Sequence, residues 1–259
     1  MQFYRFDSRN VSFAEYRRLT PGLGFLIAAL LKILRIPLPV RMALPYPGEI
    51  QVREPSELPE GVYGRLVPFI APCEREGLRS KLFYQEPIIA PDSRTLGVAL
   101  LSDDRLTYGF LAEAENNTAV GIQRRVDLSL ITPLSNGRMI VTGRSKQNLD
   151  SPPEMEKEVL PDAPVEKVIA WHRDRLRALR GPQPVPIEGR LEDFILKIER
   201  LGFDYFIRRR IYVPMAEAEV EKLRAAKPLT KGRAALVSNL IWVAAMITVF
   251  LGFRGCSLF

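Results

Sequence analysis

The chain has 259 residues, enough for one domain with extensions or for two small domains, and its formal net charge is +7. The excess of Lys and Arg is modest and spread along the sequence. No nucleic-acid-binding motif or dense arginine tract accompanies it, which argues against a nucleic-acid partner. The two cysteines, Cys73 and Cys256, are too few for a metal site built from cysteine.

Residues 1–45 are predicted to form an N-terminal arm that contains two helices. Ser12 and Glu15 have the spacing of a capping box, which is typical of the start of a helix, and the run Thr20-Pro21-Gly22 ends that helix. After the second helix, repeated prolines over residues 37–55 indicate an extended linker.

The second helix of the arm, residues 22–36 (GLGFLIAALLKILRI), is apolar and short. Its fifteen residues reach about 22 Å, which is less than the roughly 30 Å hydrocarbon core of a bilayer. Two interpretations remain open: the helix lies in the membrane interface with Lys32 and Arg35 reaching towards water, or it is buried against the domain. We favour membrane contact because residues 23–31 are apolar on every side of the helix.

Residues 46–213 are predicted to form an α+β domain, built on an antiparallel meander of about five strands with helices on one face. Residues 49–53 are a possible first strand. Short turns such as Asn116-Asn117 connect the later strands, and short turns force neighbouring strands to run antiparallel. The candidate strands of the meander are 81–90, 95–101, 106–115, 119–132 and 138–144.

A helix is expected before the meander. It begins at Ser56, and apolar residues recur at helical spacing as far as Cys73, which we interpret as a small core residue. Pro68 and Pro72 fall inside this stretch, and we expect them to kink or divide the helix.

Two further helices are expected after the meander. Residues 147–164 form a long polar loop, and Asp162 is in position to cap the helix that follows. A longer helix begins at Glu188 and carries an apolar stripe. Residues 214–233 are strongly charged, so we predict a solvated stalk there.

Residues 234–253 (AALVSNLIWVAAMITVFLGF) are predicted to be a transmembrane helix, because they carry no charge and are long enough to cross a bilayer. Basic residues are concentrated before this segment and only Arg254 follows it. The positive-inside rule therefore places the bulk of the chain in the cytoplasm and the tail, 254–259, across the membrane. This single-pass, tail-anchored topology separates Cys73 from Cys256, so no disulfide between them is expected.

Eight cations are predicted to bind anionic lipid headgroups at the membrane surface. Three lie within the stalk, two in the apolar helix of the arm, and three at a basic helix end. For the helix end, the alternative is an exposed terminus favoured by the helix dipole, and both interpretations can hold together. The eight are Lys32, Arg35, Arg208, Arg209, Arg210, Lys227, Lys231 and Arg233.

No catalytic residue, cofactor or metal site is predicted. The sequence contains no G-x-S-x-G, H-E-x-x-H, P-loop or dinucleotide-binding motif. His172, the one histidine, lies on the apolar stripe of its predicted helix, which favours a structural role over a catalytic one. The pair Asp103-Asp104 falls in a predicted turn, where adjacent carboxylates mostly serve the turn's own hydrogen bonds.

Three hypotheses for the function follow. The first is a tail-anchored membrane protein whose cytoplasmic domain is a non-enzymatic subunit, adaptor or scaffold of a membrane complex, with anionic lipid headgroups and a protein as partners. The second is a membrane-tethered domain that binds a lipid or another small apolar ligand between sheet and helices. The coarse order of elements resembles the helix-grip lipid-binding architecture, and this hypothesis requires an apolar cavity of a few hundred Å³. The third is an enzyme that uses His172, which requires this histidine in a cleft with a nucleophile or carboxylate within reach.

Overall fold

The structure is a computed structural model, and it describes residues 1–20, 22–37, 41–58, 61–85, 88–91, 93–118, 121–145 and 148–226. The predicted transmembrane helix at 234–253 and the tail at 254–259 lie outside these residues, as do the cations Lys227, Lys231 and Arg233. Among the described helices, none is both long enough and apolar enough to cross a membrane.

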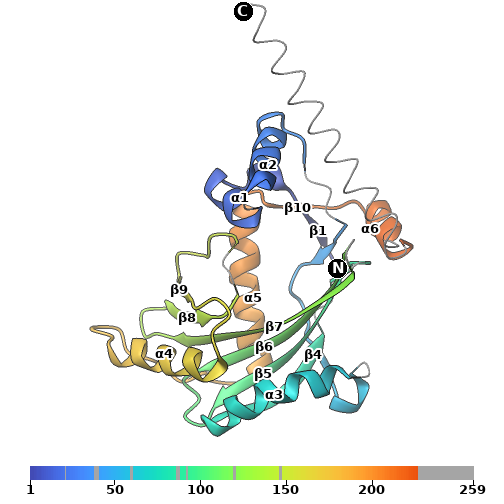
Figure 1. The fold of residues 1–259 in the computed structure, drawn as a ribbon. Helices are drawn as coiled ribbons and strands as arrows, with labels where there is room; N and C mark the ends of the chain where they lie inside the picture. The colour runs from blue at the N-terminus through green and yellow to red at the C-terminus, as the bar shows by residue number, and fades with distance from the viewer. Residues whose placement is uncertain are drawn as a thin grey trace, which may run out of the picture.

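A seven-stranded sheet forms the centre of the domain, in the order β3-β4-β5-β6-β7-β8-β9 (Figure 1). The strands predicted from the sequence correspond to β3 and to β4 through β8, and neighbours among these run antiparallel, as their short connections require. The strands are β3 (Gln51–Arg53), β4 (Leu78–Gln85), β5 (Ser93–Ser102), β6 (Tyr108–Thr118), β7 (Gly121–Pro133), β8 (Met139–Gly143) and β9 (Met155–Val159).

The seventh strand corrects the prediction of an all-antiparallel meander of about five strands. β9 pairs with β8 in parallel, from Met139↔Met155 to Gly143↔Val159, so the sheet is mixed. This strand lies inside the stretch 147–164 that the sequence predicts as a polar loop. Its sequence, MEKEV, is mostly charged and lacks an apolar alternation, so periodicity does not reveal it.

A second, three-stranded antiparallel sheet was not predicted. Its order is β10-β1-β2, with β1 (Phe3–Phe6) in the middle, β2 (Leu44–Pro45) on one side and β10 (Tyr212–Pro214) on the other. It joins residues of the predicted N-terminal arm to the segment that follows the last long helix. The two outer strands contain only two and three residues, which is too short for an alternation to show.

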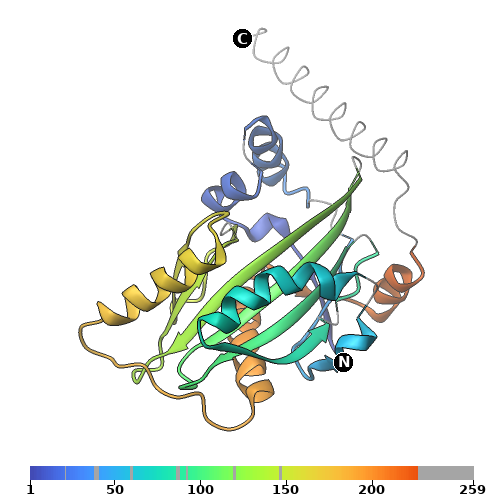
Figure 2. The ribbon, with the colours of Figure 1, turned by 60° about the horizontal axis from the view of Figure 1, so that its bottom comes forward.

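Helices cover both faces of the large sheet, so the prediction of helices on one face is wrong. α3 (Val62–Arg75) and α4 (Val165–Arg177) lie on one face, and α5 (Leu191–Arg208) crosses the other (Figure 1, Figure 2). The reason is visible in β5, where Val98 and Leu100 face the first layer while Ala99 and Leu101 face the second. A strand that is apolar on both sides requires cover on both sides.

α3 begins later than predicted from Ser56, because the residues around Ser56 form a separate 3-10 turn, η2 (Pro55–Glu57). The helix starts after Gly61, whose φ of 74° suits glycine. Neither Pro68 nor Pro72 divides it. Cys73 is fully buried in the core as predicted, and burial raises the pKa of its thiol to about 12.

The N-terminal helices pack at the C-terminal end of α5 (Figure 1). η1 (Ser8–Asn10) and α1 (Phe13–Leu19) precede α2 (Leu23–Ile33), and α6 (Glu217–Arg224) lies near the end of the described chain. The predicted capping box is confirmed: Ser12 Oγ accepts the Glu15 N–H at 3.2 Å, and Glu15 Oε2 accepts the Ser12 N–H at 2.8 Å.

Candidate functional site

Arg209, one of the eight cations predicted at the membrane surface, is bound to a buried carboxylate. Its two Nη atoms donate to Glu15 Oε1 at 2.7 Å and to Oε2 at 2.6 Å, and Glu15 is fully buried. The backbone N–H groups of Ser12 and Asp150 donate to the same carboxylate. Burial raises the pKa of Glu15, but the hydrogen bonds from Arg209, Asp150 and Ser12 outweigh it and lower the pKa to about 2. Arg209 thus joins the end of α5 to α1 and to the loop before β9.

Three of the other predicted cations, Lys32, Arg35 and Arg210, meet at one pocket of about 690 Å³. The pocket lies where α2 and α5 end, and Arg9 of η1 contributes a fourth cation that the sequence does not single out. Arg208 is exposed and does not line it. The structure therefore gathers cations from three distant segments at one place.

The four cations of this basic pocket differ in how far their charge is matched. Arg9 forms an ion pair with Asp7, with Nη2 and Oδ2 2.6 Å apart. The Lys32 ammonium donates to two backbone carbonyl oxygens at 2.5 and 2.8 Å, and neither of these acceptors carries a full negative charge. Among the described residues, the guanidinium groups of Arg35 and Arg210 have no hydrogen-bond or ion-pair partner, and no acidic side chain lines the pocket.

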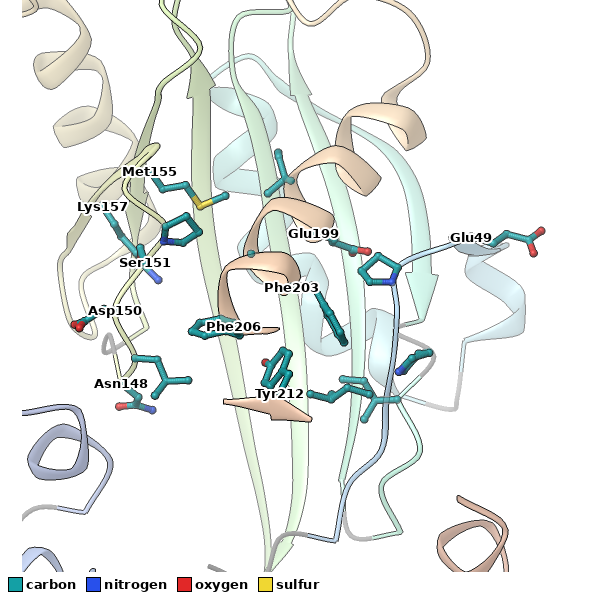
Figure 3. A pocket seen from close by; sticks show the side chains of 18 residues that line it. Glu49, Asn148, Asp150, Ser151, Met155, Lys157, Glu199, Phe203, Phe206 and Tyr212 are labelled. Carbon is teal, nitrogen blue, oxygen red and sulfur yellow. The ribbon is translucent and has the colours of Figure 1, made fainter. Parts of the chain in front are cut away.

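A second hollow, of about 530 Å³, lies between α5, β9 and the segment around β2 (Figure 3). Most of its lining side chains are apolar. Phe203 and Phe206 of α5 pack against Tyr212, with ring centroids 4.8 and 5.1 Å apart, and Figure 3 shows these three rings together at one end. Met155 reaches towards α5 from β9. We call this hollow the α5 cavity.

Lys157 is a charged residue in the lining of the α5 cavity. It lies between Glu156 and Glu158 on β9, and the alternation of a strand places these glutamates on the opposite face, where both contact Arg175 at 3.5 and 3.2 Å. Burial lowers the pKa of Lys157, and the carboxylate of Asp127 offsets only part of that effect. No described residue accepts a hydrogen bond from its ammonium group.

The carboxylates that line the α5 cavity do not pair with Lys157. Asp150 forms an ion pair with Arg18 instead. Glu49 and Glu199 lie on the other side of the cavity from Lys157 (Figure 3). Lys157 is therefore a largely buried positive group beside an apolar space, an arrangement that is costly unless a counter-charge is supplied.

His172 lies inside the protein and is 2 % exposed. Its Nε2 is 2.9 Å from the Thr132 hydroxyl and its Nδ1 is 2.9 Å from the Thr142 hydroxyl, and both threonines are fully buried. Burial lowers the pKa of His172 to about 3, and the positive charge of Arg175 adds to this effect. The imidazole is thus held neutral with both nitrogens occupied, which fits the structural role expected from the sequence.

Asp103, Asp104 and His172 line a hollow of about 320 Å³. Neither carboxylate forms a hydrogen bond with the imidazole, whose partners are two threonines. Asp104 Oδ1 accepts the Ser102 hydroxyl at 2.5 Å and the Leu106 N–H at 3.0 Å, which is the turn role expected from the sequence. Asp103 forms an exposed ion pair with Arg79. This hollow therefore does not combine His172 with a free nucleophile or carboxylate among the described residues.

Comparisons with protein-family models, with curated proteins and with solved structures found no match. Within the described ranges, no three His, Cys, Asp or Glu side chains are grouped so that they could hold a metal ion.

Proposed function

We propose that this chain is a membrane-tethered domain that binds a small amphiphile, with one apolar chain and an acidic head, in the α5 cavity. The observation that supports the proposal most directly is the cavity itself, with aromatic and aliphatic side chains on its walls and Lys157 at its edge. Its volume of about 530 Å³ falls in the range of roughly 300–1,000 Å³ that is usual for small-ligand sites. The tether is the predicted transmembrane helix at 234–253.

The walls select the apolar part of the ligand. Phe203, Phe206 and Tyr212 contribute aromatic rings to the lining, and Met155 and Ile198 contribute flexible or branched aliphatic side chains. Burying an apolar chain against such walls gains about 25 cal/mol for each Å² removed from water. A chain without branches suits a space bounded by a helix on one side and an edge strand on the other.

Lys157 selects the head of the ligand. A carboxylate placed beside its ammonium group would complete the charge compensation that Asp127 gives only in part, and would return the pKa of Lys157 towards its ordinary value. A neutral head, such as an alcohol or ester, would accept a hydrogen bond without matching the charge. We therefore expect acids to bind more tightly than alcohols of the same chain length.

The adaptor hypothesis stays a prediction, because no feature of the described residues identifies a protein partner. The hypothesis of an enzyme that uses His172 requires this histidine in a cleft beside a nucleophile or a carboxylate. The neutral imidazole between two buried threonines does not favour it.

Filling the α5 cavity is expected to abolish ligand binding without unfolding the protein. Gly202 lines the cavity from within α5, and an added Cβ there would meet nothing within 4 Å. Gly202→Leu should therefore block the space while it stabilises the helix by up to about 1 kcal/mol. The matched control is Gly64→Leu in α3, which also has open space around its Cβ but lies outside the cavity.

The measurement is equilibrium dialysis of radiolabelled dodecanoate against full-length protein in lipid nanodiscs, with empty nanodiscs of the same lipid as the blank. Wild type and Gly64→Leu should show saturable binding above the blank, and Gly202→Leu should show none. Absence of saturable binding to the wild type, or equal binding by Gly202→Leu, would contradict the proposal.

Removal of the Lys157 charge is expected to erase the preference for acids. A charged hydrogen bond contributes about 1.5–3 kcal/mol, so the wild type should bind dodecanoate at least about tenfold more tightly than dodecanol. Lys157→Met should bind the two equally, whereas Lys157→Arg should keep the preference. The ratio of the two dissociation constants is the readout, and an unchanged ratio in Lys157→Met would show that Lys157 does not contact the head.

A further inference from the structure

We infer that the surface where α2 and α5 end docks on an anionic phospholipid bilayer, with a lipid phosphate held in the basic pocket. This inference does not depend on the ligand of the α5 cavity, because the two sites share no lining residue. It concerns how the domain is oriented against a membrane.

One side of α2 exposes large apolar residues to solvent at this surface. Leu26 is 62 % exposed and Ile33 is 68 % exposed, whereas Ala28 on the other side of the helix is buried. Leu34, Ile36 and Phe13 add further exposed apolar side chains beside them. Large apolar side chains exposed in a group indicate an interaction surface, and this group comes from α2, from the residues just after it and from the start of α1.

The exposed apolar residues and the basic pocket are parts of one surface. Phe13 and Ile33 belong to both, since each is exposed and each lines the pocket next to Lys32, Arg35 and Arg210. An apolar rim around a cluster of cations is the pattern of a protein that inserts side chains among acyl chains while it binds phosphates at headgroup depth. A free phosphate would satisfy the cations and leave the apolar rim in water, so we assign the site to a bilayer.

Backbone geometry at the pocket supports a role for Arg35 and Arg210, the two arginines whose guanidinium groups have no partner within the described ranges. Arg35 and Arg210 each follow the end of a helix and each has a φ of 56°, a conformation in which glycine is the usual residue. An arginine in that conformation costs roughly 1 kcal/mol more than glycine. The helix dipole favours a cation near the C-terminal end of α2 and near that of α5. It does not require the two cations to line the same pocket.

The test is arginine footprinting of the full-length protein in nanodiscs. Phenylglyoxal modification, read by mass spectrometry, should be slower at Arg35 and Arg210 in discs of phosphatidylcholine with phosphatidylglycerol than in discs of phosphatidylcholine alone. Arg177, which is 77 % exposed and lies on α4, should react equally in both discs and serves as the internal control. The protection should weaken as salt is raised, because screening acts on exposed charges.

Two variants separate docking at the pocket from a diffuse attraction of positive charge. Arg210→Asn removes a pocket charge, and asparagine tolerates a positive φ, so the fold should be kept. Each cation near an anionic surface contributes about 1 kcal/mol, so the variant should weaken docking about fivefold, measured as loss of protection at Arg35. Arg208→Asn removes a neighbouring charge outside the pocket and should leave that protection unchanged.

Three results would overturn the inference. One is equal protection of Arg35 in both kinds of disc, and another is the same loss of protection in Arg208→Asn as in Arg210→Asn. The third is protection that is seen only in native membranes and never in discs of pure lipid, because that would assign this surface to a protein partner.

Ile33→Gln, which removes an exposed apolar side chain, should also reduce the protection at Arg35.

Discussion

Replacement of Arg209 by methionine is expected to lower the free energy of unfolding by about 3–5 kcal/mol, because it leaves the carboxylate of Glu15 buried without its counter-charge. Glu15 is fully buried and receives both Nη groups of Arg209. The same carboxylate binds the backbone of Asp150, so the loss would loosen α1, the end of α5 and the loop before β9 together.

The control for this prediction is the neighbouring residue. Arg208→Met removes an equal charge from an exposed site and should change stability by no more than about 0.5 kcal/mol. Urea unfolding of both variants, followed by circular dichroism, measures the difference. The double replacement Glu15→Leu with Arg209→Met should recover part of the loss, since removal of both partners leaves no buried charge. Equal stability of the two single variants would show that the Glu15–Arg209 pair does not hold these segments.

Acidification from pH 6.5 to pH 4.5 is expected to destabilise the protein by roughly 2–3 kcal/mol through His172 alone. The folded pKa of His172 is about 3 and the ordinary value is 6.5, so the unfolded chain binds the proton first as the pH falls. The contribution is fully present above pH 6.5 and is lost progressively towards pH 3. Glu15, whose folded pKa is about 2, loses its own contribution only below about pH 4.5.

His172→Gln separates this effect from those of the carboxylates, because the chain contains one histidine. The variant is expected to be less stable at neutral pH, but its stability should be almost independent of pH between 6.5 and 4.5. The readout is therefore the slope of the unfolding free energy against pH, and not the unfolding free energy at one pH. Equal slopes for wild type and His172→Gln would contradict the neutral, buried imidazole.

The neutral imidazole also has an expected tautomer. Arg175 donates to the Thr142 hydroxyl at 2.8 Å, which leaves that hydroxyl free to donate its own proton to Nδ1 of His172. The proton of the ring then lies on Nε2, which donates to Thr132. Nitrogen-15 chemical shifts of the ring report this arrangement directly, and a proton on Nδ1 would reverse the direction of the chain of hydrogen bonds.

The central strands could be predicted from the sequence because two signals agree there. Turn residues such as Ser135-Asn136-Gly137 mark the connections, and the alternation in β7 places Leu128 and Leu130 on one face. The second layer of cover could not be predicted so simply. Tyr84 and Tyr108 belong to the second core cluster although each carries a hydroxyl group. The two hydroxyls lie within hydrogen-bond distance of each other, which allows both side chains to be buried.

The candidate sites could be predicted only in part, because both are assembled from distant segments. The sequence indicates Lys32, Arg35 and Arg210 as surface cations, but their common pocket depends on how α2 and α5 end. Nothing in the sequence indicates that Arg9 joins them. Arg209 differs from its neighbours only through Glu15, a partner 194 positions away along the chain. Lys157 lies in a charged strand, where nothing in the sequence indicates that one lysine faces an apolar space.

The most direct test of the account is to locate a bound amphiphile on the protein. Full-length protein in nanodiscs would be irradiated with a photoactivatable dodecanoate, and the adducts would be mapped by mass spectrometry. We expect adducts within residues 198–212 and 148–157 that excess dodecanoate removes and that Gly202→Leu prevents. Adducts that are absent from these residues, or that persist there with competitor and in Gly202→Leu, would contradict it.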